Sequence, residues 1–462
     1  MCGIIGAIAH ANVVPVLLEG LLRLEYRGYD SAGLVVTNHG LQRVRTTGRV
    51  TELSKLVAQQ RAQGLAGIAH TRWATHGEPS ERNAHPHFSG EISRIAVVHN
   101  GIIENHEAIR SHLINKGFKF SSDTDTEVIA HLIAFNLEQV TDLFQAVCLS
   151  IAELQGAYAI AVMEEAHPER IVVARNGAPL LLGIGKNGNY VASDTSALLQ
   201  TTRDIIYLEE GDVAELSSRG YRIVNCLRNH LGEAVERAVH ESHLSNEAIG
   251  LGPYAHFMQK EIFEQPSAVA NTLEMVFNAQ SISPNLFGSE AEEIFSSINH
   301  ILILACGTSY HAGLVARYWL ETVAGLPCNV EIASEYRYRN PVTDPNTLVI
   351  GISQSGETAD TLAALNYAKK LGHQYSLAIC NVPESALIRQ TDLRFLTRAG
   401  PEIGVASTKA FTTQLASLLL LTVTLAKMRH KLSSEDEQRM IASLRHLPVA
   451  LQHALQVEPQ VR

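Results

Sequence analysis

The sequence lacks closely spaced cysteines. Its six cysteines stand at positions 2, 148, 226, 306, 328 and 380, and no two of them form a CxxC pair. This spacing argues against a disulfide scaffold or a zinc ribbon, and it is typical of proteins of the reducing cytosol. We therefore expect a cytoplasmic protein.

A basic surface and a membrane-spanning run are missing as well. The 37 lysines and arginines are outnumbered by 47 acidic residues, the formal charge is −10, and no five like charges are consecutive. Nucleic acids and anionic membranes are bound by basic surfaces, so we expect neither as a partner. The longest apolar stretch, residues 415–426, is shorter than the roughly twenty residues of a membrane span and predicts a buried helix. The apolar N-terminus has its first lysine or arginine at Arg23, so it lacks the cationic start of a signal peptide.

What the sequence has is length and apolar content. Its 462 residues correspond to about three units at roughly 150 residues each. With 46% apolar and 18% charged residues, such a chain buries a substantial core, which excludes disorder as its main state.

The first half of the chain predicts an α+β sandwich. Short β-branched runs alternate with turn residues up to about residue 215, with helical patterns at 13–24 and 127–137. Thr124 and Glu127 have the spacing of a capping box and predict the start of the second helix. The expected strands are 2–8, 33–37, 66–70, 95–100, 158–163, 171–174 and 190–193.

The second half predicts a doubly wound α/β fold. Residues 216–290 have the composition of a connector that contains one helix, from 256 to 276, bent near Pro266. Each apolar run beyond residue 291 is followed by a polar loop and a helical pattern, as in a parallel sheet buried on both faces. Such sheets bind ligands at the carboxyl ends of their strands. The expected strands are 301–305, 347–352, 376–380 and 393–397.

Cys2 is the first candidate for chemistry. Removal of Met1 leaves Cys2 with a free α-amine, whose pKa of about 7.7–8.0 allows it to take the proton of the adjacent thiol. This is the N-terminal nucleophile arrangement, in which one residue supplies both attacking atom and base. The alternative interpretation is a small apolar residue that opens a strand.

A second candidate is the segment His70-Thr-Arg-Trp-Ala-Thr-His-Gly, followed by Asn83-Ala-His-Pro-His87. Arg72 offers a planar fork of donors that suits a carboxylate. The histidines suggest a metal site, but no helical i,i+4 pair or acidic partner accompanies them, so we expect no metal.

Asn100-Gly101 and Asp125 each have a structural and a functional interpretation. Asn100-Gly101 ends a predicted strand and is either a hairpin turn or an oxyanion hole made of the Asn100 amide and the Gly101 backbone N–H. Asp125 stands at a predicted helix start, where an acidic residue complements the helix dipole. From the residues alone we interpret it as a cap and not as a ligand for an ammonium group.

Three hydroxyl-rich loops in the second half predict a phosphate site. They are Ile352-Ser-Gln-Ser-Gly-Glu-Thr358, Ala305-Cys-Gly-Thr-Ser309 and Ser407-Thr-Lys409, each at a strand exit or a helix start. Free N–H groups at a helix N-terminus bind phosphate without a cation. Capping alone explains any single loop, whereas three together favour a ligand.

A glycine pattern at residues 183–188 matches GxGxxG but leads into another strand, so it predicts a hairpin. We therefore expect no dinucleotide and no other cofactor.

In this order the segments resemble the glutamine–fructose-6-phosphate aminotransferase (isomerizing) family, the glucosamine-6-phosphate synthases. The resemblance extends from Cys2 to about residue 450. It depends on Cys2-Gly-Ile-Ile-Gly, Glu25-Tyr-Arg-Gly-Tyr-Asp-Ser-Ala-Gly33, the segment at His70, Val98-His-Asn-Gly, Ser193-Asp, Met258-Gln-Lys-Glu-Ile, Ala305-Cys-Gly-Thr-Ser, Ser353-Gln-Ser-Gly-Glu-Thr and Glu402-Ile-Gly-Val-Ala-Ser-Thr-Lys409.

The resemblance implies a domain order. Residues 2–216 would form a class II glutamine amidotransferase domain with the N-terminal nucleophile sandwich, followed by a connector over 217–290. Residues 291–435 would form a first sugar isomerase (SIS) subdomain, and 436–462 a linker toward a second one.

It also implies the roles of the residues around Cys2, which would attack the glutamine side-chain amide. Arg72 would hold the substrate α-carboxylate and Asp125 its α-ammonium group. The remaining positions are Asn100 and Gly101 at the oxyanion, Thr75 and His76 in the pocket wall, and Trp73 beside the passage for ammonia.

In the second half the resemblance implies a site for fructose 6-phosphate. The phosphate-binding loop would be Ser353, Gln354, Ser355 and Thr358, and the further sugar contacts Thr308, Val405 and Ser407.

The second SIS subdomain of the family, with its Schiff-base lysine, ring-opening histidine and proton-transferring glutamate, has no counterpart in the 462 residues. The sequence is either a fragment or a naturally truncated chain. We expect a complete glutaminase half and an incomplete isomerase half.

Two other functions fit part of the sequence. An amidotransferase with another ammonia acceptor would need a pyrophosphate- or ATP-binding half, and the sequence has no P-loop and no acidic diphosphate signature. A sugar-phosphate-binding regulator would not need the nucleophile set around Cys2. Residues 416–426 are apolar nearly all round, so we expect the chain to associate. The resemblance implies a homodimer for full-length family members, which associate through their isomerase halves, and leaves the stoichiometry of these 462 residues open.

Overall fold

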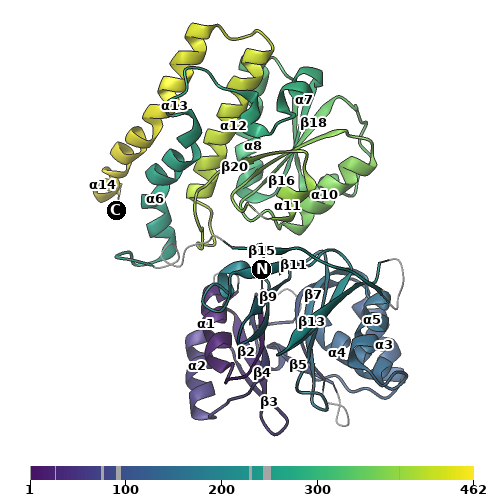
Figure 1. Cartoon of the computed structure of the whole chain (residues 1–462). Coiled ribbons are helices and arrows are strands. Elements are labelled where there is room, and N and C mark those ends of the chain that lie inside the picture. The colour runs from purple at the N-terminus through teal and green to yellow at the C-terminus, as the bar shows by residue number, and fades with distance from the viewer. Residues whose placement is uncertain are drawn as a thin grey trace. The chain divides into compact units, whose positions relative to one another are not determined.

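The computed structural model describes residues 2–25, 28–73, 77–89, 95–227, 232–242, 251–383 and 385–461. The chain divides into two compact units, unit 1 (Met1–Asn246) and unit 2 (Glu247–Arg462) (Figure 1).

Unit 1 contains two antiparallel sheets. The eight-stranded sheet has the order β15-β11-β9-β10-β1-β4-β2-β3, and the seven-stranded sheet the order β14-β13-β12-β8-β7-β6-β5. The strands of the first sheet are β1 (Gly3–Ala9), β2 (Ser31–Thr37), β3 (Leu41–Thr46), β4 (Ala66–Arg72), β9 (Leu181–Gly185), β10 (Gly188–Ala192), β11 (Asp204–Tyr207) and β15 (Val239–Glu241). Those of the second are β5 (His87–Phe88), β6 (Ile95–Ile103), β7 (Gly156–Glu164), β8 (Ile171–Asn176), β12 (Asp212–Ser217), β13 (Gly220–Asn225) and β14 (Glu233–Ala234).

Three apolar clusters hold unit 1 together. One lies between the sheets and includes Ile4 and Val98, which point inward from β1 and β6. Ile5, on the other face of β1, packs with the outer helices of the first sheet, and Val97 packs with those of the second. The layers are therefore helix, sheet, sheet, helix, and the predicted α+β sandwich is confirmed. The helices are α1 (Val14–Leu24), α2 (Val50–Gln59), α3 (His106–Asn115), α4 (Asp125–Leu137) and α5 (Leu143–Glu153).

The capping box predicted before α4 forms only in one direction. Thr124 is the N-cap, and its hydroxyl accepts a hydrogen bond from the Glu127 N–H at 3.4 Å. The Glu127 carboxylate does not return to Thr124; it accepts from the backbone N–H groups of Ser121 and Ser122. The reciprocal half of the prediction was wrong because the loop before the helix offers the carboxylate closer donors.

Strand β6 extends further than the sequence indicated. It continues through Asn100 and Gly101 to Ile103, and these two residues pair with Ala159 and Tyr158 on β7. The hairpin interpretation of Asn100-Gly101 is therefore wrong. By contrast, the GxGxxG pattern forms the β9–β10 hairpin that was predicted, with Gly185 paired to Gly188.

Unit 2 contains a five-stranded parallel sheet in the order β17-β16-β18-β19-β20, which confirms the doubly wound prediction. Its strands are β16 (His300–Ala305), β17 (Cys328–Ile332), β18 (Thr347–Ser353), β19 (Tyr375–Cys380) and β20 (Leu393–Leu396). Strand β17 was not predicted, because only its first residue, Cys328, is buried and it lacks a continuous apolar run. The helices are α6 (Phe257–Thr272), α7 (Ala291–Ser297), α8 (Gly307–Trp319), α9 (Ala333–Tyr336), α10 (Ala359–Lys370), α11 (Ala386–Gln390), α12 (Lys409–Met428), α13 (Ser434–Leu455) and α14 (Glu458–Val461).

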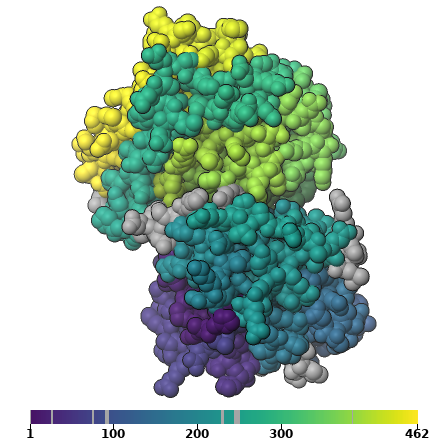
Figure 2. All heavy atoms as spheres, in the orientation of Figure 1, coloured from purple at the N-terminus to yellow at the C-terminus, as the bar shows by residue number. Residues whose placement is uncertain are grey.

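Two segments of unit 2 differ from their predicted form. Helix α6 contains Pro266 and ends at Thr272, and a short 3₁₀ turn, Glu274–Val276, replaces the last predicted turn. Residues 436–462 were expected to form a linker, but helix α13 continues to Leu455. The helix buries only three side chains, Glu437, Ile441 and Leu444, and Figure 2 shows its yellow atoms at the surface of the unit.

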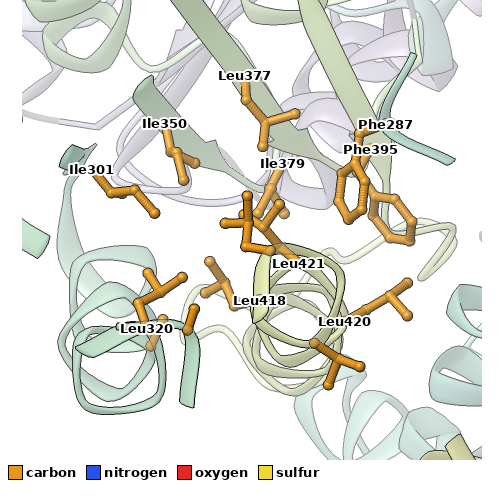
Figure 3. Close-up of a cluster of buried hydrophobic side chains, with 14 of the residues drawn as sticks. Phe287, Ile301, Leu320, Ile350, Leu377, Ile379, Phe395, Leu418, Leu420 and Leu421 are labelled. Atoms are coloured by element: carbon orange, nitrogen blue, oxygen red, sulfur yellow. The ribbon is translucent and has the colours of Figure 1, made fainter. Parts of the chain in front are cut away.

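Helix α12 is the centre of the unit 2 core. It has the length and composition of a membrane span, yet all twenty of its residues are buried or half-buried within the unit. Figure 3 shows Leu421 pointing toward Ile379 on the sheet, while Leu420 points from another side of the helix. The sheet, α6, α8 and α13 contact α12, so its apolar surface, which had suggested a dimer, is covered by the chain itself.

We predict that Leu421→Ala lowers the free energy of unfolding of unit 2 by about 2–5 kcal/mol, because it leaves a cavity under the sheet. Trp73 and Trp319 are the two tryptophans, one in each unit. Denaturant unfolding followed by Trp319 fluorescence in a Trp73→Phe background therefore reports unit 2. The matched control is Val342→Ala at a fully exposed position, where we expect a change within about 0.5 kcal/mol. Equal losses in both variants would contradict the placement of α12 at the core.

Candidate active site

Cys2 lies directly before β1. Its Sγ accepts a hydrogen bond from the Trp73 backbone N–H at 3.3 Å and lies 3.5 Å from the Trp73 carbonyl oxygen. Burial raises the pKa of the thiol, whereas the Trp73 hydrogen bond and the charge of Arg72 act in the opposite direction. The thiol is thus protonated at neutral pH and needs a base before it can attack.

One small pocket brings most of the predicted residues together. Within the described residues, its wall contains the predicted Cys2, Arg72, Trp73, Gly101 and Asp125. The other lining residues are His85, His99, Thr124 and Thr126. Asn100 is 7% exposed and reaches the same place, because its Nδ2 donates to the Cys2 carbonyl oxygen at 3.1 Å.

Arg72 is the last residue of β4 and only 3% of it is exposed. Its guanidinium donates to the carbonyl oxygens of Gly77, at 2.9 Å, and Glu78, at 3.4 Å. Burial lowers its pKa, and the nearby Cys2 and Asp125 act in the opposite direction. The two carbonyl groups fix the plane of the fork beside the pocket.

Asp125 is the first residue of α4, while Thr124 is the N-cap. The Asp125 carboxylate accepts from the Ile103 backbone N–H on β6 at 3.0 Å and is 5% exposed. Our interpretation of Asp125 as the cap is therefore corrected: its side chain ties the helix start to β6 and lines the pocket.

Gly101 has a backbone that only glycine adopts readily. Its φ is +133°, and a Cβ there would lie 2.0 Å from the Ala157 carbonyl oxygen. In this conformation the backbone of Gly101 lines the pocket. Gly101 is exposed there, next to Asn100, and a backbone N–H beside a side-chain amide has the composition of an oxyanion hole.

The remaining predicted residues of unit 1 are less defined. Trp73 is 38% exposed, and its ring meets that of Tyr29 edge-on with centroids 5.3 Å apart. Thr75 and His76 lie outside the described residues.

Sequence reasoning missed the role of the buried histidines. Neutral rings form a stack in which His70 lies parallel to His85, with centroids 4.0 Å apart, and His87 meets His85 edge-on at 4.9 Å. Thr126 links His99 to this stack, because its Oγ1 lies 3.0 Å from His99 Nδ1 and 3.3 Å from His85 Nε2. The available signal was that His70 and His99 fall within apolar strand runs, where a charged side chain would not be tolerated.

In unit 2 two of the predicted hydroxyl loops follow the neighbouring strands at the switch point of the sheet. Strands β16 and β18 are neighbours and the chain leaves them toward opposite sides, which is where doubly wound sheets bind ligands. Thr308, in the first turn of α8, follows β16, and Ser353 ends β18. The predicted Gln354 and Ser355 complete the loop before α10, of which Thr358 is the N-cap.

The loop after β18 is held by its own hydroxyl groups. Ser353 Oγ accepts from the Gly356 N–H at 2.9 Å and lies 3.2 Å from Thr358 Oγ1. Gly356 has a φ of +67°, and a Cβ there would lie 2.0 Å from Ser385 Oγ. This tight turn connects the end of β18 to the start of α10.

The third loop precedes α12. Val405 is exposed, and the Ser407 hydroxyl donates to the Glu402 carboxylate at 3.1 Å. Glu402 also accepts from the N–H groups of Thr408 and Ala410. Since its hydrogen is engaged, the Ser407 hydroxyl is left as an acceptor.

These two sites define a class of protein, in which an N-terminal amidotransferase sandwich is joined to a sugar isomerase fold. Matching family descriptions agree: "Glutamine amidotransferase domain" over residues 70–200 and "SIS domain" over residues 294–424.

Comparisons with known proteins identify the family. A glutamine–fructose-6-phosphate aminotransferase (isomerizing) of Bordetella parapertussis is 55% identical over 465 residues, covering 100% of this chain and 75% of the relative. One of Xylella fastidiosa is 54% identical over 462 residues, with the same coverage. The chain therefore belongs to the glutamine–fructose-6-phosphate aminotransferase (isomerizing) family. Among solved structures, the C-terminal domain of glucosamine-fructose-6-phosphate aminotransferase from Francisella tularensis is 47% identical over 45% of this chain and 58% of that one, with a TM-score of 0.44.

The histidine stack predicts an acid-sensitive unit 1. Burial lowers the pKa of His70 and His87 to about 3, and that of His85 well below its usual 6.5. The unfolded chain takes up these protons near pH 6.5, so the stability they confer is complete above pH 6.5 and is lost progressively toward pH 3. Each histidine contributes a loss of about 1.4 kcal/mol per pH unit in that window.

The measurement is denaturant unfolding between about pH 7 and 5, above the range in which carboxylates titrate, followed by Trp73 fluorescence in a Trp319→Phe background. His87→Gln should reduce the pH slope by the share of one histidine, whereas His112→Gln, at an exposed position on α3, should leave it unchanged. Identical slopes in all three chains would contradict the prediction.

Proposed function

We propose that this chain releases ammonia from glutamine at Cys2 and uses it to convert fructose 6-phosphate to glucosamine 6-phosphate, with glutamate as second product. The observation that carries the proposal is the convergence of Cys2, Arg72, Asn100, Gly101 and Asp125 on one pocket. Membership of the aminotransferase family supports the choice of acceptor.

The chemistry of the first half follows from Cys2. Once Met1 is removed, the α-amine takes the thiol proton and Sγ attacks the side-chain amide carbon of glutamine. Asn100 Nδ2 and the Gly101 N–H stabilise the resulting oxyanion. The C–N bond breaks with return of the proton to nitrogen, ammonia leaves, and water cleaves the thioester to give glutamate and free thiol.

Recognition of the amino acid falls to two buried charges. Arg72 binds the α-carboxylate through its fork, and Asp125 binds the α-ammonium group. From the family resemblance we also assign Thr75 and His76 to glutamine binding. Trp73 follows Arg72 directly in sequence, and we place it beside the passage through which ammonia leaves.

The second half supplies the sugar-phosphate site. Ser353, Gln354, Ser355 and Thr358 bind the phosphate at the start of α10, where free N–H groups and the helix dipole favour an anion. Thr308, Val405 and Ser407 contact the sugar. The engaged hydrogen of Ser407 makes it an acceptor from a sugar hydroxyl group rather than a phosphate donor.

The setting of the enzyme is also part of the proposal. The resemblance predicted a glutaminase over 2–216, a connector over 217–290, a first SIS subdomain over 291–435 and a linker over 436–462. Strands β13 to β15 pair within the sheets of unit 1, and α6 packs in the core of unit 2. We therefore assign the glutaminase to Met1–Asn246 and the SIS subdomain to Glu247–Arg462. The enzyme would act in the cytoplasm without a cofactor, and its product would enter amino-sugar nucleotide biosynthesis. Full-length members of the family would be homodimers.

The first test is glutamate release from glutamine by the purified chain with Met1 removed, with and without fructose 6-phosphate. We expect release that increases with the sugar phosphate, because the family couples its two sites. Cys2→Ala is the control and should release none. A processed chain that released no glutamate would overturn the glutaminase, and release indifferent to the sugar would overturn the coupling.

The second test addresses the sugar site directly. We expect Ser353→Ala to weaken fructose 6-phosphate binding by about 10-fold or more, because it removes a hydroxyl that also holds the Gly356 N–H. Isothermal titration calorimetry measures the change. Ser296→Ala, at an exposed position of α7, is the matched control and should bind like the parent chain. Equal binding by both variants would contradict the assigned loop.

A further inference from the structure

We propose that His70 is a positioning residue for the glutaminase reaction: its Nε2–H fixes the side-chain amide of Asn100 with the nitrogen toward Cys2. The inference rests on the proposed function, because it concerns the oxyanion hole of that reaction. It explains why a histidine lies within an apolar strand.

The geometry determines which nitrogen of His70 carries the hydrogen. His70 lies on β4 and reaches across the sandwich to β6, where its Nε2 is 3.0 Å from the His99 carbonyl oxygen and 3.0 Å from Asn100 Oδ1. A carbonyl oxygen only accepts, so Nε2 must be the protonated nitrogen. Its N–H is shared between the two oxygens, and Nδ1 has no hydrogen-bond partner among the described residues.

The same contacts determine the orientation of the Asn100 amide. Its oxygen faces the Nε2–H of His70, and its nitrogen faces the Cys2 carbonyl oxygen at 3.1 Å. If the amide rotated by half a turn, its N–H₂ group would face the Nε2–H of His70, and its oxygen would face the carbonyl oxygen of Cys2. Both contacts would then be repulsive. Such a rotation would also turn a lone pair toward the place where the oxyanion forms.

His70 is itself held in place. Its ring stacks on His85 at an angle of 19°. His85 Nδ1 accepts from the His99 backbone N–H at 3.3 Å, so its Nε2 is protonated and donates to Thr126 Oγ1 at 3.3 Å. Burial lowers the pKa of His70 to about 3, so it donates as a neutral ring.

His70 acts through Asn100 and does not touch the substrate. It is 1% exposed, and the described residues that line the pocket do not include it. Its N–H is already engaged by two acceptors, which leaves it no part in acid–base chemistry at Cys2. Loss of the donor should therefore affect the step in which the oxyanion forms and leave glutamine binding nearly unchanged.

The test compares His70→Phe, which keeps a stacking ring but has no donor, with His70→Gln, whose amide N–H lies the same number of bonds from the backbone as Nε2. We expect the phenylalanine variant to lower kcat for glutamate release by about 10–100-fold, approaching the roughly 10²–10³-fold loss of an oxyanion donor in Asn100→Ala. KM for glutamine should stay near the parent value. The glutamine variant should restore most of kcat.

Two further readouts separate positioning from a merely structural role. Glutamate γ-semialdehyde forms a tetrahedral adduct with the thiol, and its affinity should fall by the same factor as kcat. Alkylation of Cys2 by iodoacetamide forms no oxyanion, so its rate should not change. His70→Leu takes the place of the phenylalanine variant if that chain does not fold.

Each other outcome overturns the proposal. Equal losses in the phenylalanine and glutamine variants, or a parallel fall in alkylation rate, would mean that His70 only supports the structure. Parent-like kcat in the phenylalanine variant would mean that Asn100 needs no positioning. A parent chain that releases no glutamate overturns the proposed function together with this inference, whereas an active parent with any of the other results overturns this inference alone.

Discussion

The site of unit 1 depends on the alternation of side chains along three strands. Ile4, Ile68 and Val98 point into the cluster between the sheets. Side chains two residues apart share a face of a strand, so Cys2, His70 and Asn100 point into the same space. The register of β1 against β4, with Gly3 opposite Thr71, then brings Cys2 to the end of β4. There the Trp73 N–H, the first backbone donor beyond that strand, binds its thiol. A slip of one residue in either strand would turn these groups to the opposite face.

The sequence predicted those parts of the fold that depend on periodicity. Alternating or continuous apolar runs marked the strands of both units, and the doubly wound order placed Thr308 and Ser353 at neighbouring strand ends. Strand β17 was missed because it lies at the edge of the sheet and is mostly half-buried or exposed. Asn100-Gly101 has the composition of a turn, yet it continues β6, since pairing with nine residues of β7 outweighs local preference.

The site was less predictable than the fold because its residues act in pairs that no spacing reveals. The acidic residue at a helix start and the histidines near Arg72 each had an ordinary local explanation. Only the packing of α4 against β6 joins Asp125 to the Ile103 N–H, and only the stacking of the two sheets joins His70 to Asn100. Resemblance to a family identified most of these positions, but not His70, whose contacts exist only in three dimensions.

Burial also sets the electrostatics of the pocket. Arg72 and Asp125 are charged groups largely removed from water, and the negative charge of Asp125 favours the charged form of Arg72. Buried charges are costly unless other groups compensate them. Here Arg72 donates to the carbonyl oxygens of Gly77 and Glu78, and Asp125 accepts from the Ile103 N–H. These bonds hold two opposite charges at fixed places in one pocket wall, which is the arrangement that the proposed binding of a zwitterion requires.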